Sequence, residues 1–229
     1  MDRSIAAKRC ARVAEAISRL VPPGVAVSVH STASGDPAAA GCRPDSVLAA
    51  TARRRALHEA GRRSAATVVA HLGSDASPGV AAADGAPTWP VGVVGSISHS
   101  GDIAAAVAGR STDVRGLGID LEARLRLPSS RAPLFSDERE LAWLSAQPVS
   151  ARPRLVLILF CAKESVQKCL RATCGRVPAA DATHISLDPR ARRFEAVYVG
   201  PAPPTAGFVL QGRFTQRSGY TVAVAWTAS

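Results

Sequence analysis

Two long segments with helical spacing of apolar residues, each bordered by short strand-like runs, constrain this 229-residue chain most strongly. The first spans 45–72 and ends before Gly73, and the second spans 152–171. The resulting order is a strand, a long helix and a strand pair, followed by a strand, a long helix and a group of strands. This order predicts an α+β fold made of two similar halves, 1–112 and 113–229.

Shorter signals complete the expected element order. Asp45 is the expected N-cap of the first long helix, and Ser136 is the expected N-cap of a short helix. A further helix is expected over 2–21. Alternation predicts strands at 25–30, 91–100, 102–109, 114–122, 183–187, 193–199, 207–214 and 219–226. The segments 31–44, 74–90 and 124–134 are expected to be loops.

Composition excludes several classes of protein. The chain is 47% hydrophobic with a mean hydropathy of +0.09, which is incompatible with a disordered polymer. No apolar run reaches the roughly 20 residues of a membrane span, and the first 20 residues carry charges where a signal peptide would be apolar. Five cysteines occur without a Cys-x-x-Cys pair, so zinc or thioredoxin chemistry is disfavoured. We therefore expect no membrane association and a reducing, cytoplasmic location.

The charge balance points to an anionic partner. The formal net charge is +10, and only three of the 28 basic residues are lysines. Two of these three, Lys163 and Lys168, lie within six residues, and a compact ammonium differs from a guanidinium in how it meets a phosphate. A nucleic-acid-binding module is the weaker alternative, because aromatic residues make up only 4% and no zinc or helix-turn-helix pattern occurs.

The string GIDLE places two acids on one face of a strand. Side chains alternate along a strand, so Ile119 and Leu121 share the core face while Asp120 and Glu122 share the other, beside Gly118, which should leave open space. Two neighbouring carboxylates repel each other, and a hard divalent cation would offset that repulsion. The alternative is an exposed strand carrying two solvated acids.

The string FCAKESVQK carries a third acid. Glu164 and Lys168 are four residues apart on the second long helix and follow a strongly apolar turn, so they are expected at the rim of a buried site. Glu164 could complete a magnesium site with Asp120 and Glu122, while Lys168 neutralises a phosphate on the same metal. The alternative is a routine surface ion pair.

Two further groups suit phosphate binding. Ser98 and His99 end a strand without a G-x-S-x-G string, so a phosphate contact explains them better than a nucleophile and its base. Arg54 and Arg62 lie on nearly one face of the first long helix, and Gly61 between them suggests the close approach of a ligand or a neighbouring backbone. A structural histidine and a solvated basic helix are the alternatives.

Taken together, these strings resemble those of a known family. RRALHEAGR, WPVGVVGSISHS, GIDLE and FCAKESVQK occur in this order between about residues 53 and 170. The combination is similar to that of 4′-phosphopantetheinyl transferases of the Sfp-like group, in particular its enterobactin synthetase component D branch. The resemblance implies a pseudo-twofold pair of α+β halves with coenzyme A in the cleft between them.

The resemblance also implies a reaction. Asp120, Glu122 and Glu164 would bind Mg²⁺ with the coenzyme A pyrophosphate, and Lys168 would contact that pyrophosphate. The serine of an acyl or peptidyl carrier protein would attack the β-phosphorus, with Glu164 as base, as metal ligand or as both. The products would be the modified carrier and adenosine 3′,5′-bisphosphate. A metal-dependent phosphohydrolase using the same acids is the alternative.

The remaining implied roles concern binding. Arg54, Arg62 and His99 would hold the 3′-phosphate and nearby groups, and Ser98 and Trp89 belong to the same coenzyme A site. The carrier is expected to contact 124–146 and to be steered by the basic charge of the chain. We expect a monomer, because the two halves are already fused in one chain.

Overall fold

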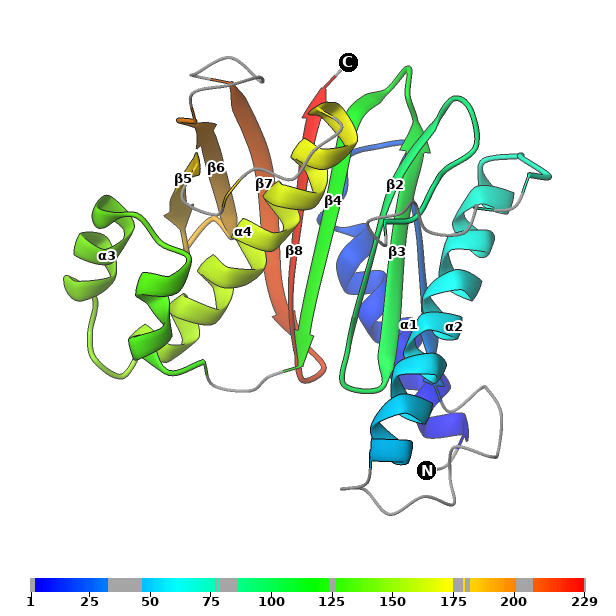
Figure 1. Cartoon of the computed structure of the whole chain (residues 1–229), viewed down its shortest axis with the longest axis horizontal. Helices are drawn as coiled ribbons and strands as arrows, with labels where there is room; N and C mark the ends of the chain where they lie inside the picture. The colour runs from blue at the N-terminus through cyan, green and yellow to red at the C-terminus, as the bar shows by residue number, and fades with distance from the viewer. Residues whose placement is uncertain are drawn as a thin grey trace.

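The computed structural model describes residues 3–32, 47–76, 78, 86–123, 127–174, 179, 182–200 and 208–228. Within them, eight strands form two antiparallel sheets, and the helices pack on both sides of these sheets (Figure 1).

The first sheet has the order β1-β3-β2 and supports one long helix. Its strands are β1 (Ala26–Ser31), β2 (Val93–Ser100) and β3 (Ile103–Arg110). The central strand β3 is rich in alanine, and these small side chains let α2 (Val47–His71) pack closely against it. Gly73, with a positive φ of 74°, follows the end of α2, where a left-handed residue commonly ends a helix.

The second sheet has the order β4-β8-β7-β6-β5. Its strands are β4 (Val114–Ala123), β5 (Thr183–Asp188), β6 (Arg193–Tyr198), β7 (Val209–Arg217) and β8 (Tyr220–Ala228). The long helix α4 (Arg152–Cys174) covers one face, and its apolar run from Leu155 to Leu159 forms the largest core cluster with side chains of this sheet. The 3-10 helix η3 (Ser129–Leu134) and α3 (Glu138–Ser145) flank α4.

The N-terminal helix α1 (Arg3–Ser18) lies behind both sheets as drawn in Figure 1. Val13 and Ile17 of α1 join one buried cluster with side chains of β3 from the first sheet and of β4 and β8 from the second. The two sheets therefore share a hydrophobic core on this face.

The structure confirms the α+β class, with a long helix on an antiparallel sheet in each half, although the sheets contain three and five strands. The division at 112/113 stays a prediction. The expected cap at Ser136 is wrong: the Asp137 carboxylate accepts the Glu140 N–H, and Glu140 accepts the Asp137 N–H in return, which completes a capping box. Ser136 lies one residue too early for this geometry. The expected cap at Asp45 falls outside the described residues.

Candidate active site between the two sheets

A ladder of serine hydroxyls joins the two sheets. Ser96, Ser98 and Ser100 alternate along β2, so their side chains share one side of the strand. Their oxygens accept the backbone N–H groups of Ile119, Leu121 and Ala123 in β4, at 3.1, 3.1 and 3.0 Å. β2 and β4 are thus held side by side and parallel by side chains, in place of the backbone ladder that joins strands within each sheet. We call these three residues the serine ladder.

The acids of β4 lie on the face predicted for them. Leu117, Ile119 and Leu121 are buried in the core shared with α1, and the alternate residues face α4. The expected open space at Gly118 is wrong, because a Cβ built there would lie 1.9 Å from the Ser165 carbonyl oxygen of α4. Gly118 therefore lets the helix backbone touch the strand, and this contact brings Glu164, the residue before Ser165, close to the β4 acids.

Asp120 is 4% exposed, and one of its carboxylate oxygens contacts two neighbouring side chains. Its Oδ1 lies 2.8 Å from the Lys168 ammonium and accepts the Ser98 hydroxyl at 3.0 Å. Lys168 also donates to the Ile119 carbonyl at 3.1 Å. The other carboxylate oxygen, Oδ2, is buried without a hydrogen-bond partner among the described residues. Because a buried acceptor left unpaired is costly, this oxygen marks a place for a cation or a donor from a ligand.

Glu122 and Glu164 lie within electrostatic reach of Asp120. Burial raises the pKa of Glu122; the Ser100 hydroxyl lowers it in part, while the charges of Asp120 and Glu164 raise it further. Burial likewise raises the pKa of Glu164, with a contribution from Asp120 that Lys168 opposes. The three predicted acids therefore repel one another in one neighbourhood. Lys168 pairs with Asp120, although its helical spacing suggested Glu164.

The three acids have the ligand chemistry that a divalent cation needs, although their positions do not form a closed coordination site. Their oxygens, with the unpaired Oδ2 of Asp120 among them, are the ligand type that Mg²⁺ prefers. They do not all lie within 4.8 Å of one another. Mg²⁺ usually keeps several of its waters and takes substrate phosphate oxygens as ligands, so a carboxylate can also hold the ion through a water, and such spacing is compatible with a metal bound together with a phosphate.

A second acidic group is tighter but already satisfied. Ligand atoms of Asp137, Glu140 and His184 lie within 4.8 Å of one another. The Lys163 ammonium lies 2.9 Å from Glu140 Oε1, and both side chains are only 1% exposed. Glu140 Oε1 also accepts the Ile185 N–H at 2.7 Å. With the Lys163 ammonium neutralising Glu140, this group already ties α3 and α4 to β5.

His99 faces a histidine that the sequence analysis did not select. The ring centroids of His58 and His99 lie 6.2 Å apart. Burial lowers the pKa of His99, and the neighbouring His58 and Lys168 lower it further, which overcomes the opposing effects of its backbone hydrogen bond and Asp120. His58 stands four residues from both Arg54 and Arg62, so one stripe of α2 carries all three side chains. The four-residue spacing of His58 from Arg54 and from Arg62 is the sequence signal that could have identified it.

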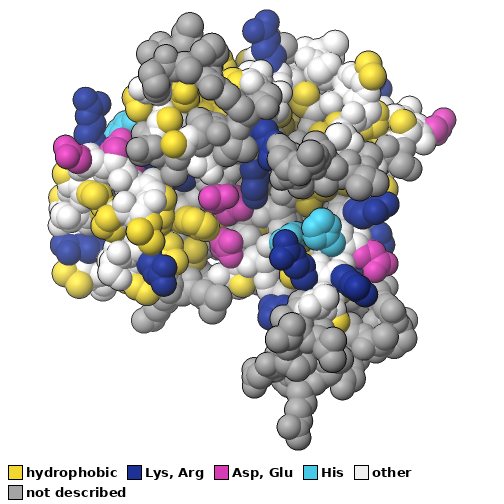
Figure 2. Space-filling model, viewed as in Figure 1, with side chains coloured by type: hydrophobic (Ala, Val, Ile, Leu, Met, Phe, Trp, Pro, Cys, Tyr) yellow, Lys and Arg dark blue, Asp and Glu magenta, His cyan; other side chains and the backbone are white. Residues whose placement is uncertain are grey.

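The front face displays these groups together. Figure 2 shows acidic side chains near its middle, with histidine and basic side chains beside them over α2. Arg54 and Arg62 are exposed and make no hydrogen bond or ion pair with a described residue. The Trp89 ring lies on Gly95, where an added Cβ would be 2.6 Å from the ring, and it packs against the α2–β3 cluster. At least part of Trp89 is therefore used in packing.

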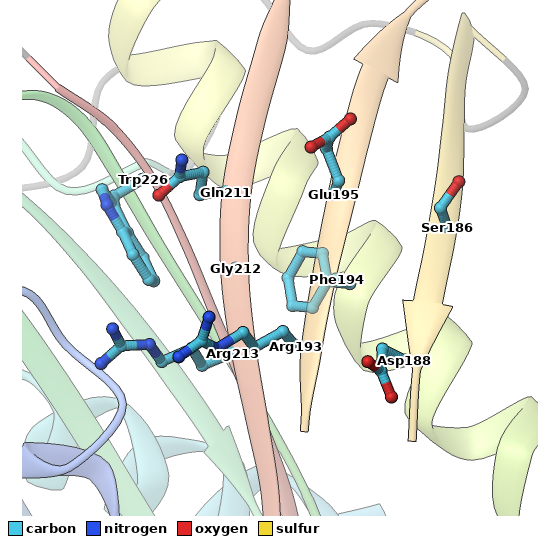
Figure 3. A pocket seen from close by; sticks show the side chains of 9 residues that line it. All are labelled: Ser186, Asp188, Arg193, Phe194, Glu195, Gln211, Gly212, Arg213 and Trp226. Carbon is cyan, nitrogen blue, oxygen red and sulfur yellow. The ribbon is translucent and has the colours of Figure 1, made fainter. Parts of the chain in front are cut away.

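A pocket of about 300 Å³ lies elsewhere, on the face of the second sheet opposite α4 (Figure 3). Its polar side chains alternate along β6 and β7 with residues of the α4 core. The Arg213 guanidinium stacks 5.5 Å from the centroid of the Trp226 ring. The pocket contains none of the predicted site residues, and the acids of β4 face the other side of the sheet.

Comparison with known proteins decides the family. A model of the 4′-phosphopantetheinyl transferase N-terminal domain matches residues 44–109, and a model of the 4′-phosphopantetheinyl transferase superfamily matches residues 116–225. The chain belongs to the 4′-phosphopantetheinyl transferase superfamily. Both the family resemblance and the enzyme class expected from the four strings are confirmed.

Curated relatives agree with the 4′-phosphopantetheinyl transferase assignment. The chain is 33% identical over 196 residues to 4′-phosphopantetheinyl transferase Svp of Streptomyces mobaraensis, covering 83% of this chain and 79% of the relative. It is 34% identical to enterobactin synthase component D of Salmonella typhi and 31% identical to 4′-phosphopantetheinyl transferase PptT of Mycobacterium tuberculosis, in each case over 62% of both chains. A likeness to the holo-[acyl-carrier-protein] synthase of Thermotoga maritima has a TM-score of 0.35 at 14% identity, over 49% of this chain and 62% of that one, which is too weak to define the fold.

Among the described residues of this 4′-phosphopantetheinyl transferase, none of the helices combines the length and the apolar character that crossing a bilayer requires.

Proposed function

We propose that this enzyme transfers the 4′-phosphopantetheine arm of coenzyme A to a serine of an acyl or peptidyl carrier protein, with Mg²⁺, and releases adenosine 3′,5′-bisphosphate. The buried, unpaired Oδ2 of Asp120 beside two half-buried acids of raised pKa carries this proposal. Mg²⁺ held by Asp120, Glu122 and Glu164 would relieve their repulsion and supply positive charge to the pyrophosphate.

The basic side of the site would hold the other end of coenzyme A. Arg54 and Arg62 are exposed on the stripe that also carries His58, and their guanidiniums suit the doubly charged 3′-phosphate. His99 would meet the same anion from β2 and gain a proton as the phosphate approaches, because a nearby negative charge raises the pKa of a histidine. Ser98 and Trp89 remain in the proposed coenzyme A site.

Two residues of α4 would handle the proton and the leaving group. As the carrier serine Oγ forms its bond to the β-phosphorus, the bond to the departing bisphosphate oxygen breaks, and Glu164 takes the serine proton directly or through a water. Its raised pKa brings this carboxylate closer to neutral pH, where a general base is most effective. Lys168 would leave Asp120 in part and stabilise the charge on the bisphosphate.

The carrier would dock beside Glu164 on a small apolar patch formed by Leu134, Phe135 and Phe160. Phe160 lies one helical turn before Glu164 and meets Phe135 edge-on, with ring centroids 5.3 Å apart. Leu134, at the end of η3, is 70% exposed. Figure 2 shows hydrophobic side chains next to the acidic group on this face. The net charge of +10 would steer an acidic carrier toward it.

The location and assembly belong to the same proposal. Cys10, Cys161 and Cys169 are buried free thiols, in keeping with a reducing cytoplasm. We expect the enzyme to act as a monomer, because residues from both halves of one chain supply the site.

One assay tests the transfer. The protein is incubated with coenzyme A, Mg²⁺ and an apo carrier protein, and the carrier is weighed by mass spectrometry. A gain equal to one phosphopantetheine arm, lost when Mg²⁺ is chelated, supports the proposal. Free adenosine bisphosphate without carrier modification would identify a phosphohydrolase. Salt-sensitive DNA retention without either product would favour a nucleic-acid-binding role.

The docking patch has its own test. Leu134→Asp should raise the KM for the carrier about tenfold or more while leaving the KM for coenzyme A unchanged, because a charge replaces an apolar contact. Val149→Asp is the matched control, since Val149 is 73% exposed in the turn between α3 and α4. Equal effects of the two substitutions on the KM for the carrier would exclude the patch.

A further inference from the structure

The last rung of the serine ladder reaches a proposed metal ligand. The Ser100 hydroxyl donates to Glu122 Oε2 at 2.8 Å, and Ser100 Oγ accepts the Ala123 N–H at 3.0 Å. Ser100 therefore belongs to the first sheet, yet it makes two bonds to neighbouring residues of the second. Glu122 Oε1 has no hydrogen bond to a described residue.

The position of Ser100 is fixed by the turn that follows it. Arg53 of α2 donates to the Gly101 carbonyl at 2.9 Å. The Asp102 carboxylate accepts the Tyr220 hydroxyl at 2.7 Å and pairs with Arg9 of α1. Side chains from two helices and from β8 thus hold the β2–β3 turn, and Ser100 is presented to Glu122 from a firmly anchored point.

Such an anchored donor matters for a glutamate. Glu122 has three rotatable side-chain bonds and lies close enough to Asp120 and Glu164 to be pushed away by their charges. A hydrogen bond to one carboxylate oxygen selects one side-chain orientation and leaves the other oxygen available. Partners of this kind orient metal ligands in other proteins, and their loss commonly weakens metal binding.

We propose that Ser100 is a positioning residue that holds the Glu122 carboxylate ready for the divalent cation, and that through it the first sheet sets the metal affinity of the second. This rests on the proposed role of Glu122 as a metal ligand. Ser96 supplies a contrast within the same ladder, because its hydroxyl accepts the Ile119 N–H and has no hydrogen bond to a carboxylate of a described residue. Loss of Ser96 removes one rung without touching a proposed ligand.

The test measures metal binding directly in the full chain. Mn²⁺ is titrated into protein saturated with coenzyme A, without carrier, and free Mn²⁺ is followed by electron paramagnetic resonance against a coenzyme A blank. Ser100→Ala should weaken Mn²⁺ binding about 10- to 100-fold. Ser100→Thr, which keeps the hydroxyl, should restore the affinity to within about threefold of the parent. Ser96→Ala should leave it within about twofold, although it too loses an interstrand hydrogen bond.

Each result has one meaning. Thermal unfolding of every variant separates a loss of folding from a loss of Mn²⁺ affinity. If Ser100→Ala fails to fold, Ser100→Cys, which has a weak S–H donor, takes its place. The Mn²⁺ affinity of Ser100→Cys should lie between that of the parent and that expected for Ser100→Ala. Equal weakening of Mn²⁺ binding by Ser96→Ala and Ser100→Ala would show that the serine ladder only holds β2 and β4 together, and would overturn the inference. Glu122→Gln distinguishes failure of the positioning role of Ser100 from failure of the proposed metal site. If Glu122→Gln weakens Mn²⁺ binding and Ser100→Ala does not, only the positioning role fails. If neither substitution weakens Mn²⁺ binding, the proposed metal site fails as well.

Discussion

Lys168 Nζ lies 2.8 Å from Asp120 Oδ1, so a proposed pyrophosphate contact and a proposed metal ligand neutralise each other in the free protein. The remaining Asp120 oxygen is the buried, unpaired one. A cation arriving with its phosphate would therefore find one carboxylate oxygen available and would compete with the ammonium for the other. Binding of metal and coenzyme A should consequently be coupled.

Lys168 provides the first test of this pair. Lys168→Ala should lower kcat about 100- to 1000-fold, because the developing charge on the bisphosphate loses its cation. Lys168→Arg should recover only part of this loss, since a planar guanidinium cannot occupy the same point between Asp120 and the Ile119 carbonyl. Steady-state kinetics with carrier in excess checks both variants. Full recovery by arginine would show that any cation suffices.

Asp120→Asn should reduce transfer at least about 100-fold and weaken Mg²⁺ activation, since an amide offers a metal less charge. The fold should persist, because the core residues Ile119 and Leu121 are untouched on the opposite face of β4. Circular dichroism and a Mg²⁺ titration of the activity are the measurements. A variant that retains parental activity would remove Asp120 from the metal site.

His58→Ala should raise the KM for coenzyme A about fivefold or more, as expected for the loss of one partner of a charged phosphate. The KM for 3′-dephospho-coenzyme A should stay at the parental value, because this substrate lacks the anion that we assign to the α2 stripe. The ratio of the two KM values is the readout. A parallel rise for both substrates would place His58 away from the 3′-phosphate.

Gly118→Ala should destabilise the protein by about 1–3 kcal/mol, because its Cβ would overlap the Ser165 carbonyl and push α4 off the strand. Activity should fall with it, since Glu164 and Lys168 would shift. Gly61→Ala is the control: its Cβ would meet only side chains, the Ile97 Cγ2 atom at 3.2 Å and the Ala104 Cβ atom at 3.9 Å, and the gain in helix propensity of about 1 kcal/mol opposes that crowding. Urea unfolding compares the two, and equal losses would contradict the close-contact explanation.

Asp137 links stability to acid. Burial alone would raise the pKa of Asp137, but the Glu140 N–H and His184 hydrogen bonds lower it below its usual value. Stability from this group is therefore complete above the unfolded pKa of about 4 and is lost as the pH falls through the lower folded pKa. Asp137→Asn, which can still cap α3, should cost about 1 kcal/mol at pH 7 and nothing once the native aspartate is protonated. Urea unfolding at several pH values tests this, and a cost that persists unchanged in acid would refute it.

The periodicity of strands and helices predicted which face of its element several of the proposed site residues occupy. Strand alternation placed Asp120 and Glu122 opposite Leu121, and helical spacing put Arg54 and Arg62 on one stripe, because both rules depend only on near neighbours. The same rule applied at four residues would have added His58. The role of Gly118 was misjudged, because only the docking of α4 shows that a backbone carbonyl occupies the space beside it.

Strand alternation and helical spacing could not predict the contacts between the two halves. The pairing of Lys168 with Asp120 joins residues 48 apart, and helical spacing favoured Glu164 as the partner. The serine ladder has a visible signal, three serines at alternate positions, but nothing local says that these side chains meet β4 rather than water. The order of the strands settles that question.

The position of α1 bears on how such enzymes can be recombined. Val13 and Ile17 pack against side chains of β3 in the first sheet and of β4 and β8 in the second, so this helix holds together the two sheets that carry the proposed site. In a hybrid that joined the first 112 residues to the second half of a distant relative, α1 would pack on β4 and β8 side chains that do not fit it. Such hybrids should fold only when the β4 and β8 residues that contact α1 are kept together with this helix.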